Sequence, residues 1–302
     1  MTSLLAIATA LTAMITAPGP LSGTLLQPSP SSPIVLIVPG SGPTDRDGNS
    51  PLGITAAPYR QLAEALANEG VATLRIDKRG MFGSKTAVPD ANAVTIADYA
   101  ADVHAWAKAI RARTGAACIW VLGHSEGGLV AVTAAQQREG VCGVILVAAP
   151  GRKLGDILRD QLRANPANAP IMGDALAAIA ALERGDRIDV SGLHPALQTL
   201  FASPVQPYLI DTFAIDPARL AARTTAPMLI ISGGRDLQVP VGDGAALAAA
   251  QPNAQHVVIP RMNHVLKAVA SEDRNANLGT YADPSLPVAP QLVEAIAAFV
   301  KR

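Results

Sequence analysis

The stretch VLGHSEGG, Val121–Gly128, decides the fold of this chain. An apolar run, Cys118–Gly123 (CIWVLG), comes before it and predicts a buried strand, and Gly128–Gly140 (GLVAVTAAQQREG) predicts a helix. Between them stands Ser125, with a glycine two residues before it and another two residues after it. A residue in so sharp a strand-to-helix turn has strained backbone angles, and Cβ atoms at the flanking positions would collide. The pattern G-x-S-x-G therefore predicts a nucleophile elbow that lifts Ser125 clear of a sheet.

Short apolar runs alternate with longer helical patterns along most of the chain. This alternation predicts an α/β fold with a mostly parallel sheet that helices cover on both faces. The predicted strands are Ile34–Gly40, Val71–Gly80, Cys118–Gly123, Val141–Pro150, Ala226–Asp236 and Gln255–Pro260. Helices are predicted at Tyr59–Gly70, Thr95–Thr114, Gly128–Gly140 and Pro290–Arg302.

One segment, 151–225, interrupts this alternation because it contains helical patterns separated by Pro and Gly and no convincing strand. It predicts a helical cap inserted over the carboxyl ends of the strands, where open α/β sheets bind ligands. The expected core is then 27–150 together with 226–302, and 1–26 holds an N-terminal apolar segment and an entry strand.

The apolar stretch Leu4–Ile15 near the start has two interpretations. It has the length of a signal-peptide core and is too short for an ordinary membrane span, but no Lys or Arg precedes it. The alternative is an ordered N-terminal helix. Exported and cytoplasmic locations both stay open.

Composition excludes some classes of function. The 302 residues include 24 Lys and Arg and 24 Asp and Glu, so the net charge is zero and no basic excess favours nucleic-acid binding. The two cysteines, Cys118 and Cys142, have no metal-ligand spacing, and no cofactor is expected. They begin two strands that should be neighbours, so we expect them to lie close together. We expect two free thiols rather than a disulfide, because parallel pairing makes the bridging geometry awkward.

A nucleophilic serine needs a general base and an acid that orients the base. Where a nucleophile elbow occurs, the chain order is Ser, acid, His. Asp236 follows the predicted strand Ala226–Asp236, and His264 follows the next strand, so both should lie at the edge of the sheet that carries Ser125. His256 begins a strand and should lie far from that edge, while His124 is expected to pack and orient its neighbours.

The loop after the first predicted strand, GSGPTDRDGN at Gly40–Asn49, should pass over the nucleophile. The backbone N–H groups of Glu126 and Ser41 are the candidates for an oxyanion hole. The same loop resembles a calcium loop through its spaced acidic residues, but Ser50 and Ala56 occupy positions that this motif needs for Gly and Glu. Its charged residues are expected to form a local network that stiffens the loop.

Five stretches carry a resemblance to a known family: GSGPTDRDGN, DKRGMFGS, GHSEGG, GGRDLQVP and NHVLK, between Gly40 and Lys267. The chain resembles α/β-hydrolase serine esterases, and among them the bacterial carboxylesterases of the Thermotoga esterase D group. The resemblance implies a triad of Ser125, Asp236 and His264 that hydrolyses short-chain esters without a cofactor. Pro39 departs from the pattern, because such enzymes usually have His before the oxyanion glycine.

The expected partner is a small-molecule ester, with no nucleic acid and no membrane span. A serine peptidase or an acyl thioesterase remains an alternative because the same triad serves all three reactions, and a catalytically silent ligand-binding module is the alternative outside enzymes. The oligomeric state is left open, with a homodimer among the alternatives. The residues expected to wall the substrate pocket from the cap are Leu158, Leu200, Phe201 and Tyr208.

Overall fold

A mostly parallel sheet forms the centre of the molecule. The computed structural model describes residues 11–302, and within them the sheet has eight strands in the order β1-β2-β4-β3-β5-β6-β7-β8. The pairs β1–β2 and β2–β4 are antiparallel, and the other pairs are parallel. The strands are β1 (Leu11–Ala17), β2 (Leu21–Gln27), β3 (Ile34–Val38), β4 (Ala72–Ile76), β5 (Ile119–His124), β6 (Val141–Val147), β7 (Met228–Gly233) and β8 (Gln255–Ile259).

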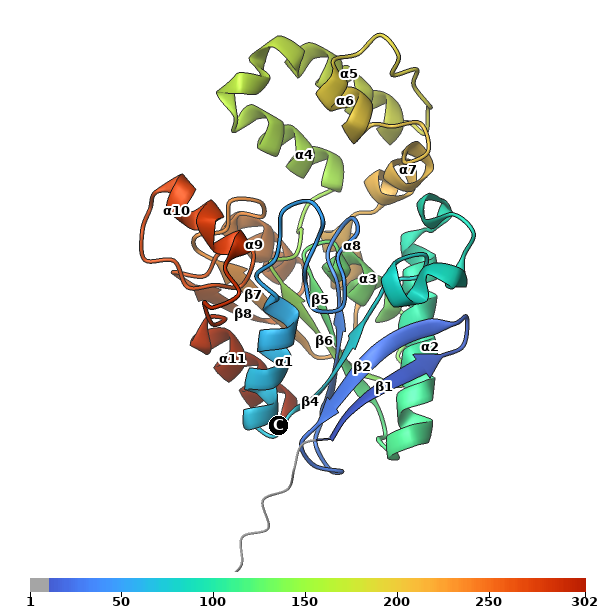
Figure 1. Cartoon of the computed structure of the whole chain (residues 1–302), viewed down its shortest axis with the longest axis vertical. Helices are drawn as coiled ribbons and strands as arrows, with labels where there is room; N and C mark the ends of the chain where they lie inside the picture. Colours follow the sequence, from blue (N-terminus) through green and yellow to red (C-terminus); the bar gives the residue numbers. More distant parts are fainter. Residues whose placement is uncertain (1–10) are drawn as a thin grey trace, which may run out of the picture.

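Helices cover both faces of this sheet (Figure 1). On one face α1 and α11 share a core with Val35 and Ile37, and on the other α2 and α3 share a core with Ile34 and Leu36. The central strands bury side chains on both sides, which explains their continuous apolar sequences. The helices are α1 (Pro58–Asn68), α2 (Ile96–Thr114), α3 (Gly127–Ala134), α4 (Leu154–Arg163), α5 (Met172–Glu183), α6 (Pro195–Leu200), α7 (Gln206–Ala214), α8 (Pro217–Arg223), α9 (Val241–Ala250), α10 (Arg274–Gly279) and α11 (Pro290–Val300), with short 3-10 helices at Phe82–Ala87, Ala91–Ala93, Pro166–Ile171 and Thr280–Ala282.

Between β6 and β7 the chain leaves the sheet and forms α4 to α8, and the described residues 148–227 contain no strand. Figure 1 shows α4 to α7 beyond the carboxyl ends of the strands, where they share an apolar core that includes Ile179, Phe201 and Phe213. The last helix, α8, differs because it packs against α3 and α9 beside the sheet. We therefore define the cap as α4 to α7, which ends before the expected boundary at residue 225.

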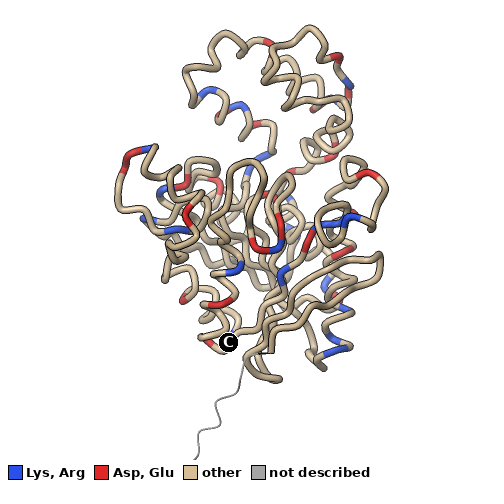
Figure 2. Tube along the Cα trace, in the orientation of Figure 1, with Lys and Arg blue, Asp and Glu red and all other residues tan. Residues whose placement is uncertain are grey.

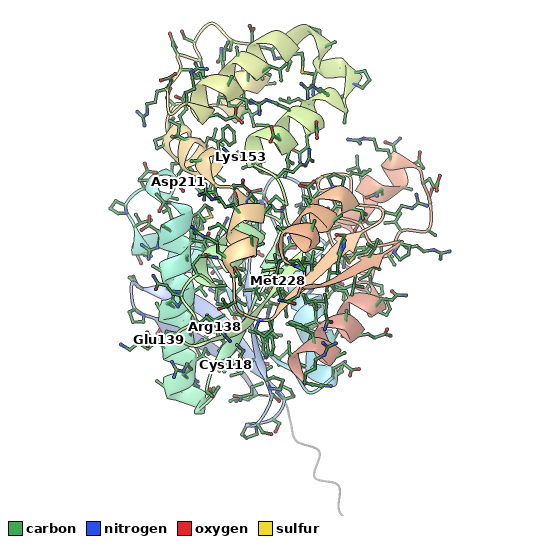
Figure 3. The ribbon with its side chains drawn as sticks, turned by 180° about the vertical axis from the view of Figure 1, so that it is seen from behind. Cys118, Arg138, Glu139, Lys153, Asp211 and Met228 are labelled. Carbon is green, nitrogen blue, oxygen red and sulfur yellow. A yellow bond between two sulfur atoms is a disulfide. The ribbon has the colours of Figure 1, made fainter. Side chains whose placement is uncertain are left out.

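Polar contacts attach both ends of the cap to the core. Arg152 forms an ion pair of 2.9 Å with Asp243, a fully buried carboxylate on α9. On the other side, the carboxylate of Asp211 on α7 accepts a hydrogen bond of 2.9 Å from the N–H of Ile96 at the start of α2. Figure 3 shows Lys153 and Asp211 at the level where the cap meets the sheet layer. These contacts set the position of the cap over the strands.

Residues 11–17 form strand β1, so the ordered-helix interpretation of the apolar start is wrong for this part. The strand pairs with β2 through a tight turn at Gly19, which has a φ of 98°. Its side chains alternate, with Met14 exposed and Ile15 buried. A period of two with β-branched residues favours a strand over a helix. Residues 1–10 lie outside the described residues, and with them most of the predicted signal-peptide core.

Cys118 and Cys142 form a disulfide, so the expectation of two free thiols is wrong. The expected proximity is confirmed, with the two Cα atoms 5.2 Å apart. The register of the β5–β6 pair shifts between Ile119 and Trp120, which leaves Cys142 as an extra residue on β6. A bulge of this kind re-aims a side chain, and it explains how two parallel strands bring their thiols together. Figure 3 labels Cys118 at the end of the sheet away from the cap.

Basic and acidic residues are interspersed along the trace (Figure 2), as the zero net charge suggests. Among the helices that the structure describes, none is both long and apolar enough to cross a membrane.

Candidate active site

Ser125 stands in a strained turn between β5 and α3. Its φ is 54°, a left-handed conformation that is uncommon for a residue with a side chain. A Cβ at Gly123 would collide with the backbone of Gly127, and a Cβ at Gly127 would collide with the carbonyl of Val38. The two glycines let β5, the turn and β3 approach closely, as the spacing in the sequence predicts. The next residue, Glu126, is the N-cap of α3, so its N–H points from the positive end of the helix dipole.

Asp236 and His264 are brought together by the loops after β7 and β8. Nδ1 of His264 donates to Oδ2 of Asp236 over 2.8 Å, and both side chains are buried. The other carboxylate oxygen accepts from the N–H groups of Gln238 and Val239 at 2.8 and 2.9 Å. These bonds orient the carboxylate, and the hydrogen on Nδ1 leaves Nε2 of His264 free to accept a proton.

Ser125 and His264 line the same small cavity, which has a volume of about 60 Å³ and also reaches Ser41. By contrast, Nε2 of His256 pairs with the hydroxyl of Ser232 at 3.0 Å, on the last two strands of the sheet. The structure therefore brings the predicted serine, acid and histidine to one edge of the sheet and keeps His256 apart from them.

A series of hydrogen bonds links His124 to the Gly40–Asn49 loop beside Ser125. The carbonyl oxygen of His264 can only accept, so Nε2 of His124 donates to it over 2.8 Å. Nδ1 of His124 then accepts from the hydroxyl of Tyr59 at 2.8 Å, and that hydroxyl accepts from the N–H of Gly40 at 3.1 Å. Burial lowers the pKa of His124 to about 3, so the ring stays neutral and keeps this bonding direction.

These hydrogen bonds decide which backbone N–H of the loop is available as an oxyanion donor. Since the N–H of Gly40 bonds to Tyr59, the next N–H along the loop, that of Ser41, is the candidate donor. A side chain at Gly40 would be crowded, because its Cβ would lie 3.3 Å from the Cβ of Ser125.

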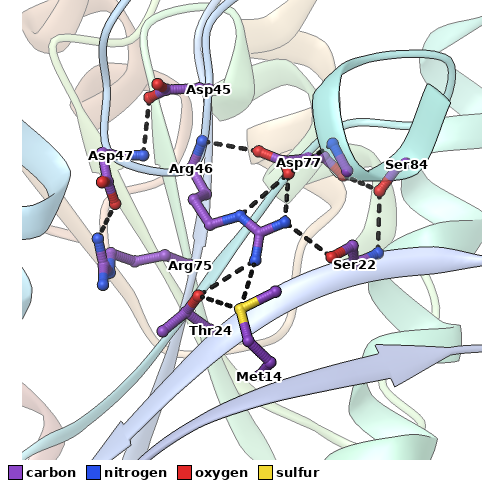
Figure 4. A network of polar contacts seen from close by, with 10 residues as sticks. Met14, Ser22, Thr24, Asp45, Arg46, Asp47, Arg75, Asp77 and Ser84 are labelled. Carbon is purple, nitrogen blue, oxygen red and sulfur yellow. Dashed lines mark hydrogen bonds and ion pairs between the residues drawn. The ribbon is translucent and has the colours of Figure 1, made fainter.

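The charged residues of the same loop form the expected local network (Figure 4). The guanidinium of Arg46 forms an ion pair with Asp77, which follows β4, and its backbone N–H donates to the same carboxylate at 2.9 Å. Asp47 pairs with Arg75 on β4. Asp45 accepts from the N–H of Asp47 at 2.8 Å. These contacts attach the loop to the sheet next to Ser41.

A second cavity, of about 800 Å³, opens from Ser125 toward the cap. Its walls are mostly apolar, and three of the four predicted pocket residues, Leu158, Leu200 and Tyr208, line it. Phe201 does not, because it is fully buried in the core of the cap itself. Residues that the sequence did not single out also line the cavity, among them Leu52, Met81, Ile157, Val205, Leu209 and Phe213.

The sequence analysis missed two buried groups near Ser125, Tyr59 and Lys78. Tyr59 lies on an ordinary apolar helix face, and nothing in its sequence context distinguishes it from a core residue. Lys78 lies two residues after the end of β4, within the stretch DKRGMFGS and inside the longer strand predicted at Val71–Gly80. A charged residue in that place is a signal that could have marked it.

The geometry agrees with the comparison with known proteins. A model of the alpha/beta hydrolase family matches residues 35–276. The chain belongs to the alpha/beta hydrolase family. It is 30% identical over 241 residues to the esterase EstD of Thermotoga maritima, an alignment that covers 78% of this chain and 54% of EstD. The chain thus spans about half the length of that relative.

Solved structures of proteins named as esterases share the overall fold. A thermophilic esterase from Thermogutta terrifontis superposes with a TM-score of 0.57 at 20% identity, covering 97% of this chain and 98% of its own. The esterase Pf2001 of Pyrococcus furiosus gives a TM-score of 0.55 at 18% identity, covering 97% and 92%. At these identities the likeness concerns the fold alone.

Proposed function

We propose that this alpha/beta hydrolase hydrolyses carboxylic esters through a covalent acyl-enzyme. Ser125 attacks the ester carbonyl while Nε2 of His264 takes the hydroxyl proton. Asp236 holds the imidazole by its Nδ1–H and stabilises the imidazolium. The N–H groups of Glu126 and Ser41 bind the developing oxyanion. His264 then gives the proton to the leaving alcohol, and a water molecule repeats the cycle on the acyl group.

The observation that carries the proposal is the 2.8 Å bond between His264 and Asp236 beside the strained Ser125. A tight turn without catalysis would need neither a buried acid–histidine pair nor a cavity shared with the serine. The resemblance to EstD, a protein named as an esterase, supports ester hydrolysis over the peptidase and thioesterase alternatives.

Short-chain esters are the proposed substrates, and the cavity of about 800 Å³ leaves room for acyl groups beyond acetyl. Each CH₂ buried against apolar walls contributes about 0.8 kcal/mol, or roughly fourfold in kcat/KM. We expect kcat/KM to rise from acetyl through butanoyl esters and to fall once the acyl chain meets the cap.

The test compares wild type with Ser125→Ala on p-nitrophenyl esters of increasing acyl length, an acyl thioester and an aminoacyl amide. Loss of Ser125 should lower kcat by roughly 10⁴-fold or more with the thermal midpoint retained. A fluorophosphonate should label Ser125 in the wild type. Faster turnover of the thioester or the amide at matched acyl group would favour the corresponding alternative, and full activity of Ser125→Ala would disprove the mechanism.

The choice of histidine has its own comparison. His264→Ala should lose activity as severely as Ser125→Ala, because Nε2 of His264 is the group proposed to take the proton. His256→Ala should stay within a few-fold of wild type. A severe loss of activity in His256→Ala, with His264→Ala near wild type, would show that the general base is misassigned.

A further inference from the structure

Lys78 is a buried lysine at the wall of the large cavity, and it directly contacts the loop above the nucleophile. Only 3% of its surface is exposed, and its ammonium donates to the carbonyl oxygen of Gly40 over 2.6 Å. Its charge partner is the buried carboxylate of Glu126, whose Oε1 lies farther away, at 3.7 Å. The ring of Tyr99 lies 5.4 Å from the ammonium. The short bond of Lys78 is therefore made to a backbone carbonyl, and the carboxylate balances its charge from a greater distance.

The carbonyl that Lys78 holds belongs to a particular peptide group. The C=O of Gly40 and the N–H of Ser41 are the two ends of the same planar amide. A cation hydrogen-bonded to the oxygen of an amide draws electron density from its nitrogen, which makes the N–H a stronger donor. It also fixes the plane of the peptide, so the direction of the N–H is fixed with it. In a buried site this effect is stronger than in water.

We propose that Lys78 polarises and orients the Gly40–Ser41 peptide, so that the N–H of Ser41 binds the oxyanion of the transition state. The inference rests on the proposed function, because it assumes that Ser41 is an oxyanion donor. Lys78 touches no reacting atom in this scheme and is a positioning residue. Its effect appears only when negative charge develops on the substrate, so it should raise kcat and leave ground-state binding nearly unchanged.

The neighbouring contacts agree with this role. The N–H of Gly40 bonds to Tyr59, so both polar atoms of Gly40 are held by buried side chains. Because the carbonyl of the Gly40–Ser41 peptide is held by Lys78, rotation of that peptide is restrained. The opposite donor, the N–H of Glu126, belongs to the residue whose carboxylate balances Lys78. The Lys78–Glu126 pair thus links the two sides of the proposed oxyanion hole.

The experiment removes the ammonium without leaving a buried charge unpaired. Lys78→Met alone would strand the carboxylate of Glu126, so Lys78→Met is made in a Glu126→Gln background and compared with Glu126→Gln. The measurements are kcat and KM on p-nitrophenyl butyrate, together with the inhibition constant of an alkyl trifluoromethyl ketone. That ketone forms a hemiketal with Ser125 and places an oxyanion in the hole.

We expect Lys78→Met to lower kcat on the order of 10-fold, a part of the 10²–10³-fold cost of losing a whole donor. KM should change by less than about twofold, and the ketone should bind more weakly by the same factor as kcat/KM falls. An unchanged kcat, or a raised KM with kcat retained, would overturn the inference. If Lys78→Met keeps its kcat while Ser125→Ala loses activity, this inference alone is overturned. Full activity of Ser125→Ala would overturn the proposed function.

Two variants separate this effect from a loss of folding. Lys267→Met is the matched control, because Lys267 is also fully buried and donates to a backbone carbonyl, that of Leu286. It should leave kcat within about twofold, and the thermal midpoints of both variants report any loss of folding. Lys78→Arg keeps a positive charge beside Glu126 but replaces the compact ammonium by a planar fork. If Lys78 only balanced the charge of Glu126, Lys78→Arg would keep the wild-type kcat. A wild-type kcat in Lys78→Arg would therefore overturn the inference.

Discussion

Gly40 shows how much of the candidate site depends on backbone groups. Its lack of a side chain lets the loop pass the Cβ of Ser125, and Tyr59 and Lys78 bind its N–H and its carbonyl. The departure at Pro39 is understandable in this light. The resemblance led us to expect a histidine there, and here two buried side chains, Tyr59 on α1 and Lys78 after β4, hold Gly40.

Tyr59→Phe tests this arrangement. The substitution keeps the ring but leaves the buried N–H of Gly40 and Nδ1 of His124 without their partner, which costs about 1–3 kcal/mol in the free energy of unfolding. We expect kcat to fall about 10-fold, because both Ser41 and the carbonyl of His264 lose a restraint. Urea unfolding and steady-state kinetics measure the two effects.

The control is Tyr281→Phe, which removes a phenol hydroxyl that accepts a bond from Gln238 and has no contact with Gly40. If both substitutions leave kcat at the wild-type value, the hydrogen bonds from Gly40 through Tyr59 and His124 to His264 have no role in positioning Ser41 or His264.

At the scale of elements, the cap should set acyl-length preference. Leu158 on α4 lines the large cavity, whereas Leu193 lies in the same cap and does not. Leu158→Trp should shorten the space for the acyl chain and lower kcat/KM on octanoyl esters at least 10-fold more than on acetyl esters. Leu193→Trp is the matched control and should change both by the same small factor. Equal losses on both esters for Leu158→Trp would contradict the assignment of this wall.

The disulfide should stabilise the sheet without affecting the chemistry. It closes a loop of 24 residues, for which chain entropy predicts a gain of about 3 kcal/mol in the free energy of unfolding. Cys118→Ser/Cys142→Ser should lose about that amount and keep kcat, because the bridge lies at the opposite end of β5 from Ser125. Thiol titration of the unfolded, non-reduced protein should find no reactive thiol, and two reactive thiols would contradict the bridge.

The elements that could be predicted from the sequence are those whose signals are local. The glycines around Ser125 and the apolar strand before it mark the elbow, and the order of strands places Asp236 and His264. The disulfide could not be predicted, because a register shift on β6 aims the side chain of Cys142. Phe201 was misplaced because a helical pattern does not tell whether an aromatic residue faces the cavity or the core of the cap.

At the scale of the whole molecule, Lys267 makes stability depend on pH. Burial lowers its pKa to about 8, against 10.5 in the unfolded chain. Between these values the unfolded chain binds more protons, so the free energy of unfolding rises with pH from 8 to 10.5, by up to about 3 kcal/mol. The stabilisation is lost as the pH falls through 8. Lys267→Met removes this slope, which urea unfolding at pH 7, 8, 9 and 10.5 measures in both proteins. Parallel curves for the two proteins would show that the folded-state pKa of Lys267 is ordinary.

The strands on either side of the cap, β6 and β7, are neighbours in the sheet. The chain therefore leaves the sheet after β6 and re-enters it at the neighbouring strand β7. Replacing the residues between Lys153 and Ile215 would leave every strand pair unchanged. A lineage could replace this segment by another set of helices while keeping Ser125, Asp236 and His264 in place. Under the proposed function, a change of substrate choice then needs no change in the sheet, and grafting caps from other hydrolases tests whether the cap alone redirects it.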